Sequence, residues 1–200
     1  MLSSPRDRLF VSLALGVLAG DIITKRLAES RLPLHQPQEF LGDVVRWTLT
    51  YNKGAAMNMS LGSSSRVVFS VLAIVMIVII VRMWRGLPPS STWLPASLGM
   101  IVAGAAGNLV DRLRSTNGVV DFIDVGFGDS RFWTFNVADS GVTVGAVILA
   151  VLTWNEPVEE AKGPAESVAS ADGAGEGAAG GAAATSSDAS RDDGAVPPAA

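Results

Sequence analysis

Apolar residues are concentrated in four stretches of the chain, and polar segments separate them. The stretches cover residues 9–23, 67–81, 94–110 and 142–152. A helix that crosses the hydrocarbon core of a bilayer needs about 20 residues, so flanking residues must extend each stretch. Tryptophans stand near the ends of these stretches, where interfacial aromatic residues are expected. The pattern predicts an all-α membrane protein with four transmembrane helices.

The polar segment between the first two stretches contains a run typical of a β-strand. Residues 44–51 read VVRWTLTY, and a second short run, RFWTF at residues 131–135, is expected to be the partner strand. We therefore predict a small extracytoplasmic β-sheet at the membrane surface. A loop at residues 62–65, GSSS, should precede the second helix, and the residues GAAG at 104–107 predict close helix packing.

Beyond Trp154 the composition changes abruptly to Ala, Gly, Ser, Asp and Pro. Residues 1–154 carry 13 Lys or Arg and 10 Asp or Glu, a net charge of +3, whereas residues 155–200 carry 2 and 9, a net charge of −7. The acidity of the chain therefore belongs to this last segment, which cannot bury enough apolar surface to offset the entropy of ordering. We predict a membrane domain over residues 1–154 and a disordered acidic tail over residues 155–200.

The composition also limits the chemistry of any active site. The chain has no cysteine, which excludes disulfides, thiolate nucleophiles and Cys-based metal sites. Its one histidine, His35, lies in a polar stretch. Carboxylates are therefore the plausible proton-handling groups.

The start of the chain also fits a signal peptide. Arg6 and Arg8 precede an apolar run that ends in Leu18-Ala19-Gly20. Cleavage there would remove a whole predicted helix. A charged start followed by an apolar run is also common in sequences that are not signal peptides, so the match is weak evidence for cleavage. We therefore favour a retained helix.

Polar residues of kinds that membrane helices usually exclude occur in five clusters. The clusters are Asp21 with Lys25; Asn52, Lys53 and Gly54; Asn108, Asp111 and Arg112; Asp121; and Asn136 with Asp139. Successive spanning helices alternate in direction, so the ends of the first and third helices and the starts of the second and fourth share one side. All five clusters should therefore meet at one membrane face. We expect this face to be the outer one, because arginines at positions 6, 8, 82 and 85 mark the opposite face as cytoplasmic.

Some of these residues have an ordinary structural explanation. Asp21 and Lys25 are spaced i, i+4, as in a simple ion pair, and Asp111 with the adjacent arginine could form a salt link. Asp121 and Asp139 have no basic neighbour one helical turn away. Because an unpaired carboxylate near lipid is costly, these two predict a pair that shares a proton.

In their order and spacing the clusters resemble the motifs of the lipoprotein signal peptidase (signal peptidase II) family. The similar segments are DIITK at 21–25, NKGAAM at 52–57, GNLVDR at 107–112, VDFID at 120–124 and FNVADS at 135–140. Ile22 stands where the family commonly has glutamine, and Met57 where phenylalanine is usual. Neither departure affects a catalytic residue. The resemblance covers the four predicted helices and leaves out the acidic tail.

The resemblance implies an aspartic endopeptidase in which Asp121 and Asp139 are the catalytic dyad. It places the substrate-binding residues Asn52, Gly54, Asn108, Arg112 and Asn136 around the dyad and the bound substrate, with Asp21 and Lys25 at the rim. The implied substrate is a prolipoprotein with a diacylglyceryl group on its lipobox cysteine, cleaved just before that cysteine. We expect a monomer of the cytoplasmic (inner) membrane that contacts membrane lipids, binds no nucleic acid and requires no metal or organic cofactor.

Carboxylate chemistry supplies a mechanism for such a dyad. Two aspartates at close range share one proton, so the ionised member can draw a proton from water while the protonated member polarises the scissile carbonyl. Asp139 should lie in the first turn of the fourth helix, where the helix dipole favours an anion. We therefore expect Asp139 to be the ionised member.

Two other interpretations use some of the same residues. Residues 126–129, GFGD, match the GxGD pattern of another group of intramembrane aspartyl proteases, but they stand in a polar loop, and we interpret them as a glycine turn. A small proton-coupled transporter could use the acids as a relay. Transporters usually have internal repeats and sites near the midplane, which this sequence does not suggest.

Overall fold

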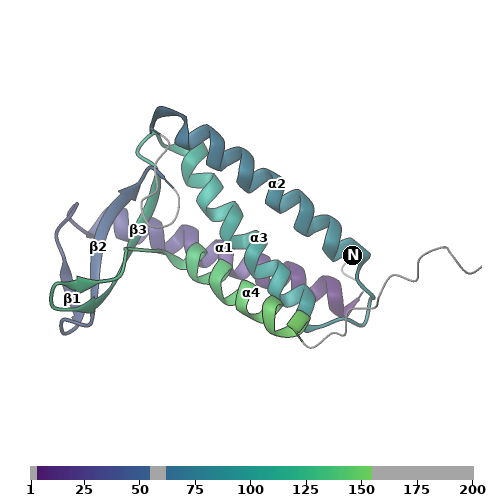
Figure 1. Ribbon diagram of the computed structural model, residues 1–200. Coiled ribbons are helices and arrows are strands. Elements are labelled where there is room, and N and C mark those ends of the chain that lie inside the picture. The colour runs from purple at the N-terminus through teal and green to yellow at the C-terminus, as the bar shows by residue number, and fades with distance from the viewer. Residues whose placement is uncertain (1–3, 55–61, 155–200) are drawn as a thin grey trace, which may run out of the picture. The chain divides into compact units, whose positions relative to one another are not determined.

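The computed structural model describes residues 4–54 and 62–154, in which four long helices lie beside one another and a small sheet stands at one end (Figure 1). The elements are α1 (Pro5–Arg31), β1 (Gln38–Leu41), β2 (Val45–Asn52), the 3₁₀ turn η2 (Gly62–Ser64), α2 (Ser65–Gly86), α3 (Trp93–Arg114), β3 (Val119–Phe127), β4 (Ser130–Arg131) and α4 (Val137–Trp154). The predicted tail at residues 155–200 and residues 55–57 of the second motif lie outside the described residues.

Each of the four apolar stretches forms a helix, as predicted, and each helix extends beyond its apolar stretch. Helix α1 begins where Ser4 caps it, because the Ser4 Oγ accepts a hydrogen bond from the Asp7 backbone N–H at 3.1 Å. Pro5 occupies the first turn, where its missing N–H costs nothing. At the same end of the molecule Phe10 stacks on Trp84 of α2, with ring centroids 4.2 Å apart.

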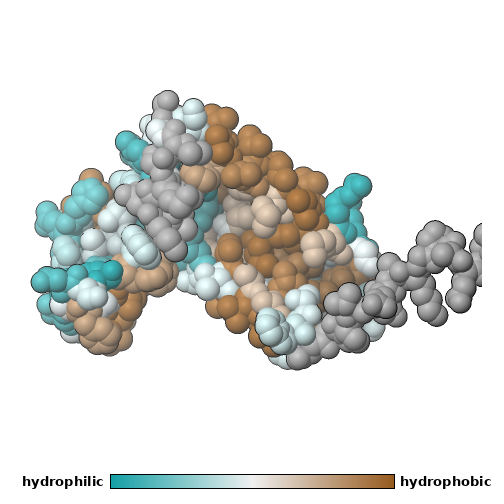
Figure 2. All heavy atoms as spheres, in the orientation of Figure 1, coloured by the Kyte–Doolittle hydropathy of each residue, from teal (hydrophilic) through white to brown (hydrophobic). Residues whose placement is uncertain are grey.

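Three of the helices are long and apolar enough to cross a membrane, namely α2, α3 and α4. Helix α1 is not among them, because Asp21, Lys25 and Arg26 interrupt its apolar sequence. The prediction of four transmembrane helices is therefore corrected to three by length and composition. Apolar side chains dominate the helical surface in view, and hydrophilic residues gather toward the sheet (Figure 2).

Helix α3 is the centre of the bundle, since it packs against α1, α2 and α4. Small residues permit the close approach, as the sequence GAAG predicted. A Cβ on Gly104 would clash with the Ala138 carbonyl of α4, and a Cβ on Gly107 would clash with the Asp21 carboxylate of α1. These two contacts place the polar end of α1 and the first turn of α4 against the same part of α3.

The sheet is antiparallel with the order β1-β2-β3-β4. The predicted strand at residues 44–51 is confirmed as β2, but its predicted partner at 131–135 is wrong. The partners of β2 are β1 and β3, and β3 holds Asp121 opposite Thr50. Strand β3 was not predicted, and the fold buries both of its acids, Asp121 and Asp124.

The glycine-rich segment after Val125 is a turn, as interpreted, and not part of a membrane helix. Gly126 and Phe127 finish β3, and Gly128, with φ +52°, begins the turn that leads to β4. Arg131 fixes this hairpin through Asp124, whose Oδ1 accepts from the Arg131 Nε at 2.9 Å. The other oxygen of Asp124 accepts from the Thr48 hydroxyl at 3.0 Å, which ties the hairpin to β2.

Candidate active site

The start of α4 is organised by a reciprocal pair of hydrogen bonds between Asn136 and Asp139. The Asn136 Oδ1 accepts from the Asp139 backbone N–H at 2.8 Å, and the Asn136 backbone N–H donates to the Asp139 Oδ2 at 3.2 Å. This is the arrangement of a capping box, with an acidic residue three positions after the cap. Asp139 lies in the first turn of α4, as the sequence predicted.

The same asparagine connects α4 to β3. Its Nδ2 donates to the Asp121 Oδ1 at 2.6 Å and to the Val120 carbonyl at 3.2 Å, and the residue is fully buried. One side chain therefore holds both Asp121 and Asp139. The resemblance implied that Asn136 lies around the dyad and the substrate; the structure places it between the two aspartates, where it bonds to residues that line the cavity described below without lining it itself.

Asn108 of α3 supplies the second contact to Asp139. Its Nδ2 donates to the Asp139 Oδ1 at 2.8 Å, and its Oδ1 accepts from the Lys25 Nζ at 2.9 Å. Because an ammonium group can only donate, Lys25 fixes which end of the Asn108 amide faces Asp139. A side chain of α1 thus sets the direction of a hydrogen bond to Asp139 on α4.

Lys25 is also the centre of a buried ion cluster. Its Nζ lies 2.8 Å from the Asp21 Oδ2 and 2.9 Å from the Asp111 Oδ2, and all three residues are at most 5% exposed. The i, i+4 ion pair is confirmed, but Asp21 and Lys25 are not at a rim, because α1 packs against α3 and α4 at Gly107 and encloses them. Asp111 pairs with Lys25 on α1 and not with its neighbouring arginine.

The ion cluster holds the two elements that carry Asp121 and Asp139. The Asp21 Oδ1 accepts from the Ala138 backbone N–H at 2.9 Å, one residue before Asp139. The Asp111 Oδ2 accepts from the Val120 backbone N–H at 3.2 Å, one residue before Asp121.

Arg112 connects the end of α3 to the second polar cluster. Its Nη2 donates to the buried Gly54 carbonyl at 3.1 Å, and the Gly54 N–H donates to the Asn52 Oδ1 at 2.9 Å. Together with the bonds above, this contact joins all five clusters of the sequence. The prediction that they meet at one end of the helices is confirmed.

A cavity of about 870 Å³ opens beside the two aspartates. Among the residues that line it are five of the predicted site residues: Asn52, Asn108, Arg112, Asp121 and Asp139. The remaining predicted residues do not line the cavity, but they bond to residues of this polar wall or to the neighbours of those residues. They are Gly54, Asn136, Asp21 and Lys25. A large, partly apolar cavity with a few converging polar groups is typical of a substrate site.

Burial, and after it the charge of Asp139, raises the pKa of the Asp121 carboxyl to about 7. Hydrogen bonds from the side chains of Asn136 and Asn52 oppose this rise. Asp121 is 2% exposed, so desolvation of its charged form is a large effect. A carboxyl with such a pKa can hold and release a proton near neutral pH, which suits acid–base chemistry.

The sequence did not reveal the other walls of the cavity. His35, Thr50 and Tyr51 line it from one side, and an aromatic segment, residues 132–135, lines it from another. Thr50 and Thr134 join these walls, with hydroxyl oxygens 2.8 Å apart. Only the sheet register could have placed Thr50 opposite Asp121. The positive φ of His35, +58°, has no signature in a single sequence.

Comparison with known proteins identifies the family. A family model described as signal peptidase (SPase) II matches residues 13–155. The chain belongs to the signal peptidase II family. The match spans all five polar clusters and ends at the start of the acidic segment, as the resemblance of the motifs predicted.

Curated relatives of the signal peptidase II chain agree with this assignment. It is similar to a lipoprotein signal peptidase of Mycobacterium avium (strain 104), 45% identical over 155 residues that cover 74% of this chain and 80% of the relative. A lipoprotein signal peptidase of Mycobacterium tuberculosis (strain ATCC 25618 / H37Rv) is 42% identical, covering 74% and 72%. The family is one of peptidases, and these relatives give no support to the transporter interpretation.

Solved structures share the fold of this signal peptidase II chain. One, described as a bacterial membrane enzyme structure obtained by the in meso method at 1.9 Å resolution, is 25% identical with a TM-score of 0.65, and the match covers 74% of this chain and 94% of that one. A second, described in the same words at 2.3 Å resolution, is 24% identical with a TM-score of 0.67, covering 77% and 92%. The second likeness concerns the fold alone.

Proposed function

We propose that this signal peptidase II chain is an aspartic lipoprotein signal peptidase in which Asp121 and Asp139 form the catalytic dyad. One observation carries the proposal: both carboxylates line the large cavity and are joined through Asn136. Within residues 4–54 and 62–154, neither of them takes part in a salt bridge. The buried acids Asp21, Asp111 and Asp124 form salt bridges with Lys25 or Arg131, which leaves the pair Asp121 and Asp139 for chemistry.

The environments of the two carboxylates support different roles. Asp121 is buried with a raised pKa of about 7, which supports its role as the protonated member. Asp139 accepts hydrogen bonds from the Asn108 amide and the Asn136 backbone N–H in the first turn of α4, an arrangement that accommodates an anion. Asp139 is therefore the ionised member and the general base. The two protonation events belong to one coupled pair.

Hydrolysis then proceeds by general acid–base catalysis. Asp139 takes a proton from water as the water oxygen attacks the scissile carbonyl carbon, and Asp121 donates its proton to the carbonyl oxygen. When the tetrahedral intermediate collapses, the C–N bond breaks and the nitrogen takes the proton that Asp139 holds. Asp121 recovers its proton from the hydroxyl that becomes a carbonyl again. The products are a signal peptide with a free carboxylate and a lipid-modified cysteine with a free amine.

The walls of the cavity support a substrate that is part peptide and part lipid. Beside the polar dyad, the cavity is lined by apolar side chains that include Phe132, Trp133 and Val144. The first two are more than half exposed, so they are available for contact. The substrate is a prolipoprotein whose lipobox cysteine carries a diacylglyceryl group, and cleavage falls just before that cysteine. The relatives that carry the name lipoprotein signal peptidase support this choice.

The orientation in the membrane follows from the distribution of basic residues. The end of the bundle that holds the start of α1 and the end of α2 carries Arg6, Arg8, Arg82 and Arg85, which favours a cytoplasmic location. The dyad at the other end then faces the outer side of the cytoplasmic membrane. Helix α1 lies alongside the three candidate spans, so the start of α1 and the end of α4 share one end of the bundle (Figure 1), and both ends of the membrane domain are cytoplasmic. The enzyme acts as a monomer among membrane lipids.

Replacement of Asp139 in cells tests the proposed function. In cells that depend on this chain for lipoprotein processing, Asp139→Asn should accumulate full-length, lipid-modified prolipoprotein while the variant itself remains folded in the membrane. The matched control is Asp129→Asn, an exposed acid in the turn after β3, which should process normally. Normal processing by the Asp139 variant would refute the dyad.

A further inference from the structure

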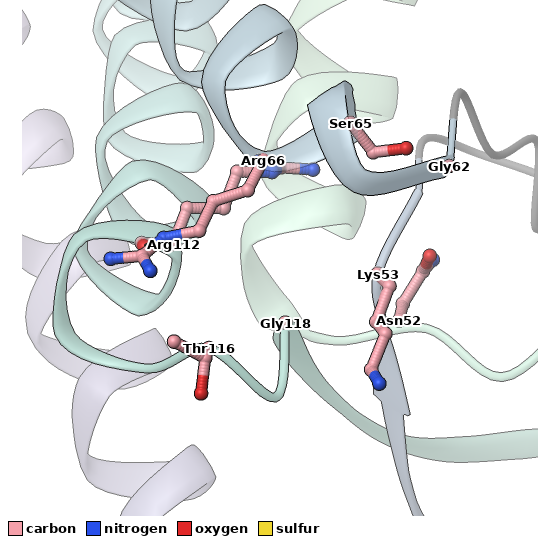
Figure 3. Close-up of a pocket in the computed structure, with 8 residues that line it drawn as sticks. All are labelled: Asn52, Lys53, Gly62, Ser65, Arg66, Arg112, Thr116 and Gly118. Atoms are coloured by element: carbon pink, nitrogen blue, oxygen red, sulfur yellow. The ribbon is translucent and has the colours of Figure 1, made fainter.

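A second cavity lies next to the proposed active site and has a different character. It has a volume of about 260 Å³, far more than the roughly 10–15 Å³ that a single water needs. The residues that line it come from the end of β2, the start of α2 and the end of α3 (Figure 3). They are Asn52, Lys53, Gly62, Ser65, Arg66, Arg112, Thr116 and Gly118.

The lining contains three cationic side chains and no acidic one. Within the part of the chain that the structure describes, none of the cations Lys53, Arg66 and Arg112 takes part in a salt bridge. The carboxylates of Asp139, Asp121 and Asp111 act on Arg112, so Lys53 and Arg66 supply most of the positive charge that attracts an anion to this cavity. The exposed hydroxyl of Thr116 adds a neutral hydrogen-bond donor to the same wall.

The two arginines are held in place by neutral partners. The Arg66 Nε donates to the Arg112 carbonyl at 2.5 Å and its Nη2 to the Leu113 carbonyl at 3.2 Å, so Arg66 caps the end of α3. Arg112 donates to the Gly54 carbonyl. Carbonyl oxygens fix the direction of a guanidinium but do not cancel its charge, so Arg66 retains its positive charge beside the cavity.

The position of the cavity along the helices indicates where its ligand comes from. Arg66 is in the first turn of α2 and Arg112 is in the last turn of α3, and both helices are long and apolar enough to cross a membrane. The cavity therefore lies at one edge of the spanning segments, at the level of lipid headgroups. Basic residues at this level attract anionic lipids by about 1 kcal/mol each.

We propose that this cavity binds the phosphate of an anionic phospholipid headgroup. Lys53 and Arg66 supply the charge, and Thr116 supplies a hydroxyl donor. Arg112 and Asn52 also line the large cavity, so the bound lipid flanks the substrate site without occupying it. A free phosphate has the same chemistry, but phospholipid phosphates are held permanently at this level of the membrane.

Lipid binding to the full chain tests the proposal without any measurement of peptidase activity. Native mass spectrometry in detergent, with phosphatidylglycerol or phosphatidylcholine as the probe, measures the affinity of each lipid. We expect tighter binding of phosphatidylglycerol. The variant Lys53→Gln should weaken it about five-fold, and Lys53→Gln with Arg66→Gln about 25-fold. Lys53 is exposed, so its single variant remains informative if the double variant unfolds.

The matched control is Arg82→Gln, which removes an exposed cation near the opposite end of α2. It should bind phosphatidylglycerol as the unaltered chain does. Equal affinity for the two lipids, or equal loss in the Arg82 and Lys53 variants, would overturn the site. A third arm adds inorganic phosphate: displacement of phosphatidylglycerol at millimolar phosphate would overturn the assignment to a lipid, and retention would support it.

Discussion

Two pairs of acids lie side by side at one end of this molecule and differ in their partners. Asp21 and Asp111 share the Lys25 ammonium, at 2.8 and 2.9 Å. Asp121 and Asp139 are both held by an uncharged asparagine, Asn136. In the first pair both carboxylates form a salt bridge, and each accepts a backbone N–H. In the second, neither carboxylate forms a salt bridge within the described residues, and burial raises the pKa of Asp121 to about 7.

The comparison teaches that the counter-charge, and not the residue type, separates a structural carboxylate from a reactive one. The pair that contacts Lys25 holds Ala138 and Val120, the residues immediately before the two reactive acids. It therefore positions the elements that the reactive pair depends on. Three changes test this division of roles: removal of the counter-charge, a change of pH that removes the shared proton, and removal of an exposed ion pair.

The largest expected effect comes from Lys25→Met. This change leaves Asp21 and Asp111 as buried carboxylates without a counter-charge, which should destabilise the fold by about 3–5 kcal/mol. Unfolding followed by circular dichroism in detergent measures the loss. Arg26→Met, at the exposed neighbouring position, is the control and should change little. Equal stability of the two variants would contradict a structural role for the cluster.

A smaller effect is expected from pH. Because Asp121 must be protonated to act as the general acid, the cleavage rate should fall about tenfold per pH unit above a pH of about 7. The initial rate of cleavage of a lipid-modified lipobox peptide, measured from pH 5 to 9, checks this. The exposed-acid variant Asp129→Asn should give a superimposable profile. A rate that keeps rising through pH 9 would rule out a protonated Asp121.

The smallest effect is expected at an exposed ion pair. Arg114 and Glu29 form a salt bridge of 3.0 Å, but the Arg114 side chain is 37% exposed, so water screens the pair. Arg114→Ala should change the free energy of unfolding by at most about 1 kcal/mol. Unfolding under the conditions used for Lys25→Met provides the comparison. A loss as large as that of the buried lysine would show that burial does not decide the worth of these ion pairs.

Much of the fold and of the site could be predicted from the sequence, because both depend on local patterns. Apolar stretches of sufficient length predicted all four helices. The alternation of helix direction predicted that polar clusters far apart in the chain would meet, and the bonds from Lys25 to Asn108 and from Asn108 to Asp139 confirm it. The place of Asp139 in the first turn of α4 also required no tertiary information.

The features that the sequence did not predict correctly depend on packing between residues far apart in the chain. Strand β3 contains two acids whose burial depends on partners elsewhere in the chain, Asn136 for Asp121 and Arg131 for Asp124. No local pattern marks such a strand as buried. The family resemblance placed Asp21 and Lys25 at a rim, whereas the missing side chain at Gly107 admits the Asp21 carboxylate into the bundle.

The most direct test of the central claim is the cleavage rate of purified Asp121→Asn on a diacylglyceryl lipobox peptide, measured together with its unfolding temperature. We predict a fall of at least about 100-fold in rate, within the range for loss of a general acid or base. The unfolding temperature should change little, because asparagine has nearly the size and shape of the protonated aspartic acid that it replaces. Cleavage within tenfold of the unaltered chain would contradict the assignment of Asp121 and Asp139 as the dyad.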